Sequence, residues 1–199
     1  MDAIILAGGS AVRLGGANKA LLQVGGERFI DRILRTLAPL FHSFTIVSSD
    51  PRPYRDLGVR VIADEQQGLG PLMGLYSGLK ASRGEASFVT AVDTPLVSAK
   101  LVERLLQTED SCDAMVPKWN GNPEPLCAVY ARRCLPHVER VLERRRIVSF
   151  FPLVRVCYLE ESAVAEVDPL GRSFLNVNSP ADYEALRSVV QDDQDAGRA

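Results

Sequence analysis

Short runs of branched apolar residues alternate along the chain with stretches in which apolar residues recur at helical spacing. The clearest runs cover residues 3–7, 44–48, 59–63 and 88–92, and polar residues follow each of them. Such alternation is typical of β-α-β units, in which strands pair in parallel and helices cover the sheet. A chain of 199 residues that is 46% hydrophobic can bury one core of this kind. The sequence therefore predicts a single α/β domain with a mostly parallel sheet.

The rest of the chain fits the same plan, with a looser pattern after Asp93. Predicted helices cover residues 29–40, 70–82, 97–106 and 132–145, and further strands cover 113–117, 126–130 and 154–159. Ser179 is a good N-cap and Pro180 suits the first helical position, so a terminal helix is predicted to begin there. We expect the domain to span residues 1–190 and the polar residues 191–199 to form a disordered tail.

The bulk composition argues against several kinds of partner. A net charge of −2 gives no electrostatic reason to expect nucleic-acid binding, and no apolar run is long enough to cross a bilayer. The first apolar run follows an aspartate and ends at glycines after five residues, which predicts a buried strand rather than a secretory signal. We therefore expect a cytoplasmic protein that binds neither nucleic acid nor membranes, and we expect it to be a monomer.

The cysteines and histidines show no metal-binding or catalytic arrangement. The cysteines at 112, 127, 134 and 157 include no CxxC pair, and the histidines at 42 and 137 lie outside any motif. Without a secretory signal, the sequence predicts four reduced and mostly buried thiols. Metal-hydrolase and catalytic-triad chemistry are therefore not indicated.

A glycine-rich segment, LAGGSAVRLGGANKALL at residues 6–22, follows the first predicted strand. Its glycines let backbone N–H groups approach phosphate oxygens, and the side chains of Arg13 and Lys19 can neutralise a polyphosphate. The segment is not a P-loop, because Ala20 follows the lysine, and it lacks the dinucleotide-binding G-x-G-x-x-G. On its own it is also compatible with a glycine-rich turn that carries two solvated charges.

Asp93 comes directly after the apolar run 88–92. In an open α/β sheet, ligands bind in the crevice at the carboxyl ends of the strands, where this carboxylate would lie. Mg²⁺ needs only one or two protein carboxylates when substrate phosphates supply other ligands, so one aspartate suffices. The alternative is a surface aspartate at a strand-to-turn junction.

The spacing LAGG-x₃-R-x-G-G-x₂-K resembles the opening of nucleotidyltransferases with a Rossmann-like fold, and most of all the molybdenum cofactor guanylyltransferases (MobA-like proteins). Four further segments agree in order: IADEQQGLGPLMGLYSGL, FVTAVDTPLV, GNPEPLCAVY and FLNVNSPADY. Together these segments span nearly the whole chain, and the final N-x-N-[ST]-P makes the match more specific than the first motif alone. The resemblance implies a single-domain, three-layer α/β/α fold with a mostly parallel sheet.

Members of this family transfer GMP from GTP to the phosphate of molybdopterin and release pyrophosphate. The resemblance therefore implies GTP and molybdopterin as substrates, Mg²⁺ as cofactor, and transient contacts with molybdoenzymes or cofactor-biosynthesis proteins. It places the GTP site at Leu6, Ala7, Gly8, Lys19, Asp64 and Asp93, with Asp93 as the Mg²⁺ ligand. Two positions depart from the family pattern: Asn18 replaces a common aspartate, and Ser48 replaces a common asparagine near the base. The shorter reach of Ser48 bears on guanine selectivity.

The residue types suit a reaction between two anions. A phosphate monoester has a second pKa of about 6, so the acceptor needs alignment and charge cancellation rather than a strong base. Lys19 is predicted to contact the α-phosphate, and Arg13 is predicted to hold the β- and γ-phosphates through its forked guanidinium. The alternatives are a surface lysine at position 19 and a structural salt bridge at position 13.

Asn176 and Asn178 alternate with Val177, so both amides point to one side of an extended segment. They can bind the pterin or help to place Mg²⁺, and either can instead satisfy buried backbone. The arginines at 144–146 contact the pterin phosphate or a partner enzyme, or they end a solvated helix. Two further functions fit the sequence: a transferase that uses CTP or another phosphorylated acceptor, and a non-catalytic nucleotide-binding regulator. The retained lysine and metal-binding aspartate argue against the regulator.

Overall fold

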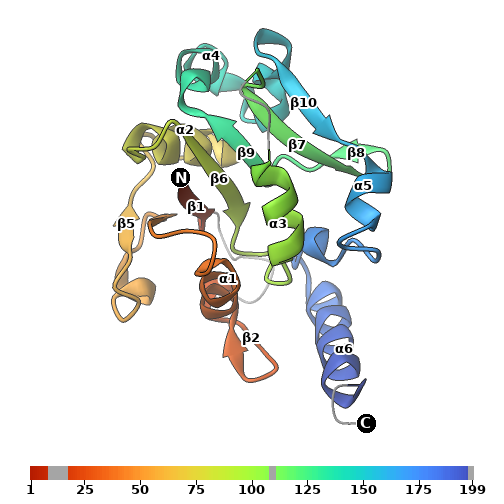
Figure 1. Cartoon of the computed structure of the whole chain (residues 1–199). Helices are drawn as coiled ribbons and strands as arrows, with labels where there is room; N and C mark the ends of the chain where they lie inside the picture. Colours follow the sequence, from red (N-terminus) through yellow and green to blue (C-terminus); the bar gives the residue numbers. More distant parts are fainter. Residues whose placement is uncertain (9–17, 108–110, 197–199) are drawn as a thin grey trace.

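The structure, a computed structural model, describes residues 1–8, 18–107 and 111–196 (Figure 1). Its main sheet contains β1 (Asp2–Leu6), β4 (Phe44–Val47), β5 (Arg60–Ile62), β6 (Ala86–Ala91), β7 (Ala114–Trp119), β8 (Asn122–Pro123), β9 (Cys127–Ala131) and β10 (Val156–Leu159). The strand order is β10-β7-β9-β6-β1-β4-β5, with β8 paired to β7. Parallel pairs join β1 to β4 and β6, β4 to β5, and β7 to β10, whereas β9 runs antiparallel to both neighbours. The predicted mostly parallel sheet is confirmed.

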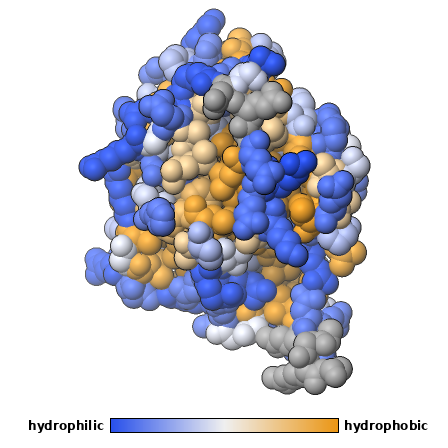
Figure 2. Space-filling view, viewed as in Figure 1, coloured by the Kyte–Doolittle hydropathy of each residue, from blue (hydrophilic) through white to orange (hydrophobic). Residues whose placement is uncertain are grey.

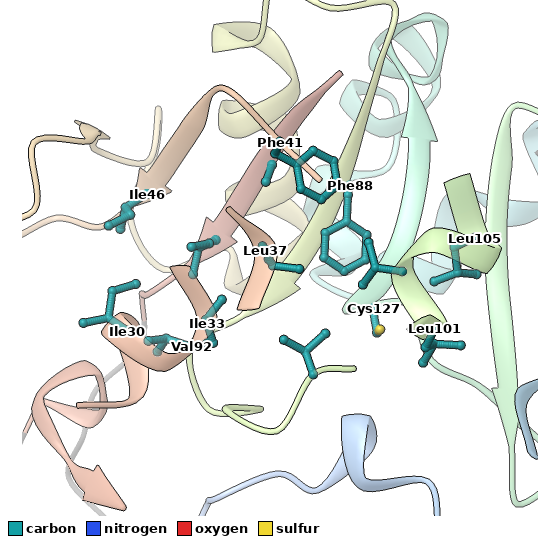
Figure 3. Packing of buried hydrophobic residues seen from close by; sticks show 14 of the residues in the cluster. Ile30, Ile33, Leu37, Phe41, Ile46, Phe88, Val92, Leu101, Leu105 and Cys127 are labelled. Carbon is teal, nitrogen blue, oxygen red and sulfur yellow. The ribbon is translucent and has the colours of Figure 1, made fainter. Parts of the chain in front are cut away.

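Helices lie on both sides of this sheet (Figure 1). They are α1 (Phe29–Leu37), α2 (Gly70–Ala81), α3 (Ala99–Leu106), α4 (Leu135–Glu139), α5 (Glu161–Ala165) and α6 (Pro180–Ala196). Successive residues of β1 face opposite layers, because Ile5 belongs to the core beneath α1 and α3, whereas Ile4 belongs to the core beneath α2 and α4. Figure 3 shows the first of these cores, where the α1 side chains lie near Phe41 and Phe88. The three-layer architecture is therefore confirmed.

The surface on the side viewed in Figure 1 is mixed in character. Figure 2 shows hydrophilic residues over much of this face, with apolar residues between them. Within the part of the chain that the structure describes, no helix is long and apolar enough to cross a membrane.

Strand β1 lies where the growth of the sheet changes direction. From β1 the chain adds β4 and β5 on one side, and it then returns to place β6 on the other side. The register sets Leu6 beside Val47 and Ala91, so the carboxyl ends of three strands meet at one edge. Ligands of open α/β sheets bind in the crevice at such a switch point. The topology therefore predicts a ligand site at this edge of the sheet.

The single helix predicted over residues 132–145 is wrong. Three short pieces replace it: η4 (Arg132–Cys134), α4, and η5 (Leu142–Arg144). Pro136 lies in the first turn of α4, where its missing N–H is harmless but prevents a helix from continuing out of the preceding turn. Arg145 then has a left-handed backbone with φ 62°, which ends η5. The hairpin of β2 (Gln23–Val24) and β3 (Glu27–Arg28), together with β8 and α5, was also absent from the sequence-based prediction.

Two of the four cysteines form a disulfide, so the prediction of four reduced thiols is wrong for this pair. Cys112 and Cys157 are bonded, with their Cα atoms 5.8 Å apart. They are 45 residues apart in the sequence and meet because β7 and β10 pair side by side. Cys127 and Cys134 are free and buried, as predicted, and burial raises the pKa of both thiols, that of Cys134 to about 12.

Helix α6 begins as predicted but extends beyond residue 190. Asp182 N–H donates to Ser179 Oγ at 3.2 Å, which caps the helix at its start. The helix continues through Ala196, where the sequence predicts a disordered tail. Arg172 Nη1 donates to both carboxylate oxygens of Asp193, at 2.7 and 2.6 Å, and this long-range ion pair supports the last turns. Polar composition alone does not reveal such a contact.

Gly171 packs against the indole of Trp119, and a substitution of Gly171 tests this contact. Its backbone is left-handed, with φ 58°, and a Cβ there would overlap the indole of Trp119. We expect Gly171→Ala to lower the free energy of unfolding by about 2–5 kcal/mol, measured by urea denaturation, because strain and overpacking add. Gly58→Ala is the control, since Gly58 has φ 64° with nothing within 4 Å of a Cβ. Equal losses in the two variants would show that the contact with Trp119 contributes nothing.

Candidate active site

A cavity of about 730 Å³ opens at the carboxyl ends of β1, β4 and β6. Its wall combines the end of β1, the segment at Lys19, the turn after β4, the start of α2 and the end of β6. All six residues expected to bind GTP line this cavity: Leu6, Ala7, Gly8, Lys19, Asp64 and Asp93. Arg13, the expected ligand of the leaving phosphates, lies outside the described residues. The structure thus brings together residues that are spread over the first half of the chain.

Lys19 connects three segments at the edge of this cavity. Its Nζ donates to Asp93 Oδ2 at 2.9 Å and to Asn178 Oδ1 at 2.8 Å. The side chains of Lys19 and Asp93 are only 20% and 21% exposed, so the surrounding protein partly shields their charges. Asn18 Oδ1 accepts a bond from Ala20 N at 2.9 Å and caps η2 (Lys19–Leu21), which fixes the start of the lysine segment without a carboxylate.

The carboxylate of Asp93 has one oxygen without a partner. Its Oδ1 is buried and accepts no hydrogen bond from the described residues, while Oδ2 binds Lys19. No group of three or more metal-binding side chains occurs among the residues that the structure covers. A single carboxylate oxygen nevertheless fits Mg²⁺, which takes hard oxygen ligands and completes its shell with water and phosphates. Asp93 is therefore a suitable ligand for this ion.

Asp64 lies between the end of β1 and helix α2. Its carboxylate oxygens would be 3.7 Å from a Cβ added at Gly8 and 3.7 Å from one added at Gly74. Its Oδ1 is buried without a hydrogen-bond partner among the described residues, and burial raises the pKa of the carboxyl group. A polar group left unsatisfied in this way is costly for folding. It is therefore ready to accept a hydrogen bond from a ligand in the cavity.

The backbone at the end of β1 is partly used by the sheet itself. Ala7 N–H donates to Val47 O at 2.9 Å, and Leu6 O accepts from Val92 N at 2.9 Å. These two groups hold the strand end in place and are not available to a nucleotide. Gly8 is the residue at which the chain leaves the sheet and enters the glycine-rich segment. Any nucleotide contact with backbone N–H groups therefore has to begin at Gly8.

Asn176 and Asn178 occupy an exposed segment that is tied to the cavity. Val177 N–H donates to Asp93 O at 2.9 Å, and the Val177 side chain is buried. Both asparagine residues are exposed to solvent, and Asn178 accepts a hydrogen bond from Lys19. The structure therefore brings Asn178 to the site directly and leaves Asn176 on the open side of the same segment.

The start of α2 forms another part of the wall. Gly70 and Pro71 line the cavity, and Gly70 has φ 67°, with the Arg145 carbonyl oxygen 3.1 Å from the position of a Cβ. Only glycine fits there without strain. Arg145, in the middle of the exposed arginine run 144–146, therefore lies against Gly70, although none of the three arginines is among the residues that line the cavity.

The sequence alone does not single out several other residues of the wall, among them Ser49, Asp50, Gly68 and Leu126. Asp50 comes two residues after the predicted strand 44–48, whereas Asp64 and Asp93 directly follow predicted strands. The position of Asp50 shortly after a strand end could therefore have indicated that it lies near the cavity.

Burying a carboxylate without partners carries a cost that can be measured. We expect Asp64→Asn to raise the melting temperature at pH 7 by about 2–4 °C, the shift that roughly 1 kcal/mol gives in a domain of this size, and to weaken GTP binding. Because the folded protein raises the pKa of Asp64, the penalty is full above that raised value and disappears as the pH falls towards 3.8. The gain should therefore shrink as the pH is lowered from 7 towards 3.8 in thermal denaturation.

Asp2→Asn is the control, and we expect it to change the melting temperature in the opposite direction. Asp2 accepts hydrogen bonds from Ser82 Oγ and Arg83 N, and these contacts leave its pKa below the usual value although its burial opposes them. Its substitution should lower the melting temperature. A loss of stability in Asp64→Asn would contradict the proposed cost of the buried carboxylate.

A mostly parallel sheet with a cavity at its switch point, lined by a lysine and a metal-competent aspartate, is an arrangement that fits a nucleotidyltransferase. Sequence comparison agrees with this class and narrows it. The chain belongs to the MobA-like NTP transferase domain family, whose model matches residues 3–156.

Individual relatives and solved structures resemble most of the chain. The molybdenum cofactor guanylyltransferase of Desulfosudis oleivorans is 34% identical, over 96% of this chain and 98% of the relative. A probable molybdenum cofactor guanylyltransferase of Methanosarcina acetivorans is 33% identical, over 95% of this chain and 91% of its own length. The crystal structure of molybdopterin-guanine dinucleotide biosynthesis protein A from Archaeoglobus fulgidus superposes with a TM-score of 0.82 at 26% identity, covering 96% of this chain and 100% of that one.

Proposed function

We propose that this protein transfers GMP from GTP to the phosphate of molybdopterin and releases pyrophosphate. The observation that carries the proposal is the Lys19 ammonium on the cavity wall, which binds both Asp93 and Asn178. The names of relatives that match nearly the whole chain support guanine nucleotide and molybdopterin as the substrates. The reaction would take place in the cytoplasm on a monomer, which would pass its product to molybdoenzymes through transient contacts.

The reaction replaces one phosphoric anhydride bond. An oxygen of the acceptor phosphate attacks the α-phosphorus of GTP, and the bond from the α-phosphorus to the oxygen bridging to the β-phosphate breaks. Pyrophosphate leaves with that oxygen. Both reactants are anions, so cancelling negative charge and aligning the reacting atoms account for most of the catalysis.

Lys19 and Asp93 would divide this task. Lys19 would donate to the α-phosphate, with Asn178 Oδ1 holding the ammonium in position. Asp93 Oδ1 would bind Mg²⁺, which neutralises phosphate oxygens when it is present. Arg13 would hold the β- and γ-phosphates through its planar guanidinium.

The nucleoside and the pterin would contact other parts of the wall. Gly8 would let the backbone approach a phosphate closely because it has no side chain. Asp64 would accept a hydrogen bond from the base or the ribose, which would satisfy its buried oxygen. Asn176 and Asn178 would face the pterin side.

Pyrophosphate release tests the proposal directly. Purified protein is incubated with Mg²⁺, molybdenum-loaded molybdopterin and either GTP or CTP. We expect release with GTP, formation of the guanine dinucleotide, and loss of both on addition of EDTA. A preference for CTP would assign a cytidylyltransferase, and GTP binding without pyrophosphate release would indicate a regulator.

A further inference from the structure

The turn after β4 places a third aspartate, beside Asp64 and Asp93, on the wall of the cavity. Ser48, Ser49 and Asp50 all line the cavity. Strand β1 lies between β4 and β6, so the strands that lead to Asp50 and Asp93 are about 10 Å apart, or two strand spacings. That separation is on the scale of a nucleoside monophosphate. A nucleotide with its α-phosphate at Lys19 can therefore bring its base towards Asp50.

The Ser48 hydroxyl is bonded within this turn, and its only proton is used there. Ser48 Oγ donates to Asp50 O at 3.2 Å and accepts from Asp50 N at 3.3 Å. Ser48 N–H also donates to Ile62 O at 2.8 Å, and the residue is only 5% exposed. Ser48 thus fixes the turn and presents Asp50 to the cavity.

Asp50 is held in its ionised form by Arg52. Its Oδ1 accepts from the backbone N of Arg52 at 3.0 Å and from Nε at 2.8 Å, while Oδ2 accepts from Nη2 at 2.8 Å. These bonds lower the pKa of Asp50 to about 2. Oδ2 carries only one of the three bonds and keeps an acceptor position. Asp50 therefore offers a negative acceptor at every physiological pH.

We propose that Asp50 selects guanine by accepting, at the remaining position of Oδ2, a hydrogen bond from the 2-amino group of the base. This inference rests on the proposed function and names the residue that makes its site specific. Adenine and cytosine present a ring-nitrogen lone pair at the equivalent edge, which a carboxylate repels. A charged acceptor thereby favours guanine and also disfavours the other bases. It supplies the selectivity that the short side chain of Ser48 cannot.

Nucleotide analogues test this assignment. The intact protein and the variants Asp50→Asn and Asp56→Asn are titrated calorimetrically with GTP, ITP, ATP and CTP in Mg²⁺. ITP lacks only the 2-amino group of GTP. In the wild type we expect GTP to bind about 10-fold more tightly than ITP, as for one hydrogen bond to a charged group. In Asp50→Asn, GTP affinity should fall by about 10- to 100-fold, and the GTP-to-ITP ratio should approach one.

Asp56→Asn is the matched control. Asp56 is also an exposed carboxylate that binds an arginine, with its Oδ2 2.7 Å from Arg28 Nη2, and it is not among the residues that line the cavity. It should leave all four affinities unchanged. Melting curves of both variants verify that each is folded.

Several results would overturn the inference. An unchanged GTP-to-ITP ratio in Asp50→Asn, or an equal loss of affinity for all four nucleotides, would mean that Asp50 does not read the base. A wild-type preference for CTP would instead refute the proposed function. A wild type that prefers GTP, with an unchanged ratio in the variant, would leave the proposed function intact and remove Asp50 from it.

Discussion

Asp93→Asn is expected to lower the turnover number on the order of 10²- to 10³-fold while GTP binding weakens less. Asparagine keeps the size of the side chain and one oxygen but loses the negative charge. The substitution therefore removes the best ligand for Mg²⁺ and the ion pair with Lys19, whose Nζ lies 2.9 Å from Asp93 Oδ2. Pyrophosphate release at saturating GTP gives the turnover number, and thermal shift with GTP reports binding. Unchanged turnover would refute the metal assignment.

Asp31→Asn serves as the control for this substitution. Asp31 is also partly buried, at 33% side-chain exposure, and pairs with Arg28 at 2.6 Å. It is not among the residues that line the cavity. Its loss should change stability modestly and leave turnover at saturating substrate near the wild-type value.

Lys19→Met should have the second large effect, again on the order of 10²-fold in the turnover number. Methionine keeps most of the apolar stem and removes the ammonium, which leaves the α-phosphate without its proposed donor and Asp93 without its counterion. Lys19→Arg retains the charge and should restore part of the rate. Lys118→Met is the control, because Lys118 pairs with Glu160 and is not among the cavity-lining residues.

The double variant Lys19→Met, Asp93→Asn tests whether the two residues act as a unit. If both residues act on the same transferred phosphate, their effects should be far from additive, and the double variant should lose little more than the worse single variant. Fully additive losses would show that the two residues act independently, contrary to the shared site.

The parts of the site that the sequence predicts are those set by local pattern. Lys19 lies within the glycine-rich segment 6–22, and Asp93 directly follows the apolar run 88–92. Because the carboxyl ends of neighbouring parallel strands meet, a residue just after a strand has a predictable place in the crevice. The β-α-β alternation likewise determines the layers before any tertiary contact is known.

The features that the sequence does not reveal depend on contacts between distant segments. The Cys112–Cys157 bond requires the pairing of β7 with β10, which no spacing of cysteines indicates. The last turns of α6 depend on Arg172 reaching Asp193, so their acidic composition is misleading on its own. The sequence suggests Ser48 as a residue near the base, but in the structure its hydroxyl bonds with Asp50 and fixes the turn.

The contact between Lys19 and Asn178 has a consequence for how the protein is made. The family model ends at residue 156, yet Asn178 completes the lysine's surroundings and Val177 binds the Asp93 backbone. Tyr183 Oη also donates to Gln23 O at 2.5 Å, so the first and last elements are joined there as well. During translation, Lys19 lacks this partner until Asn178 has been added to the chain. Lys19 therefore reaches its final contacts only after Asn178 has been synthesised and has left the ribosome.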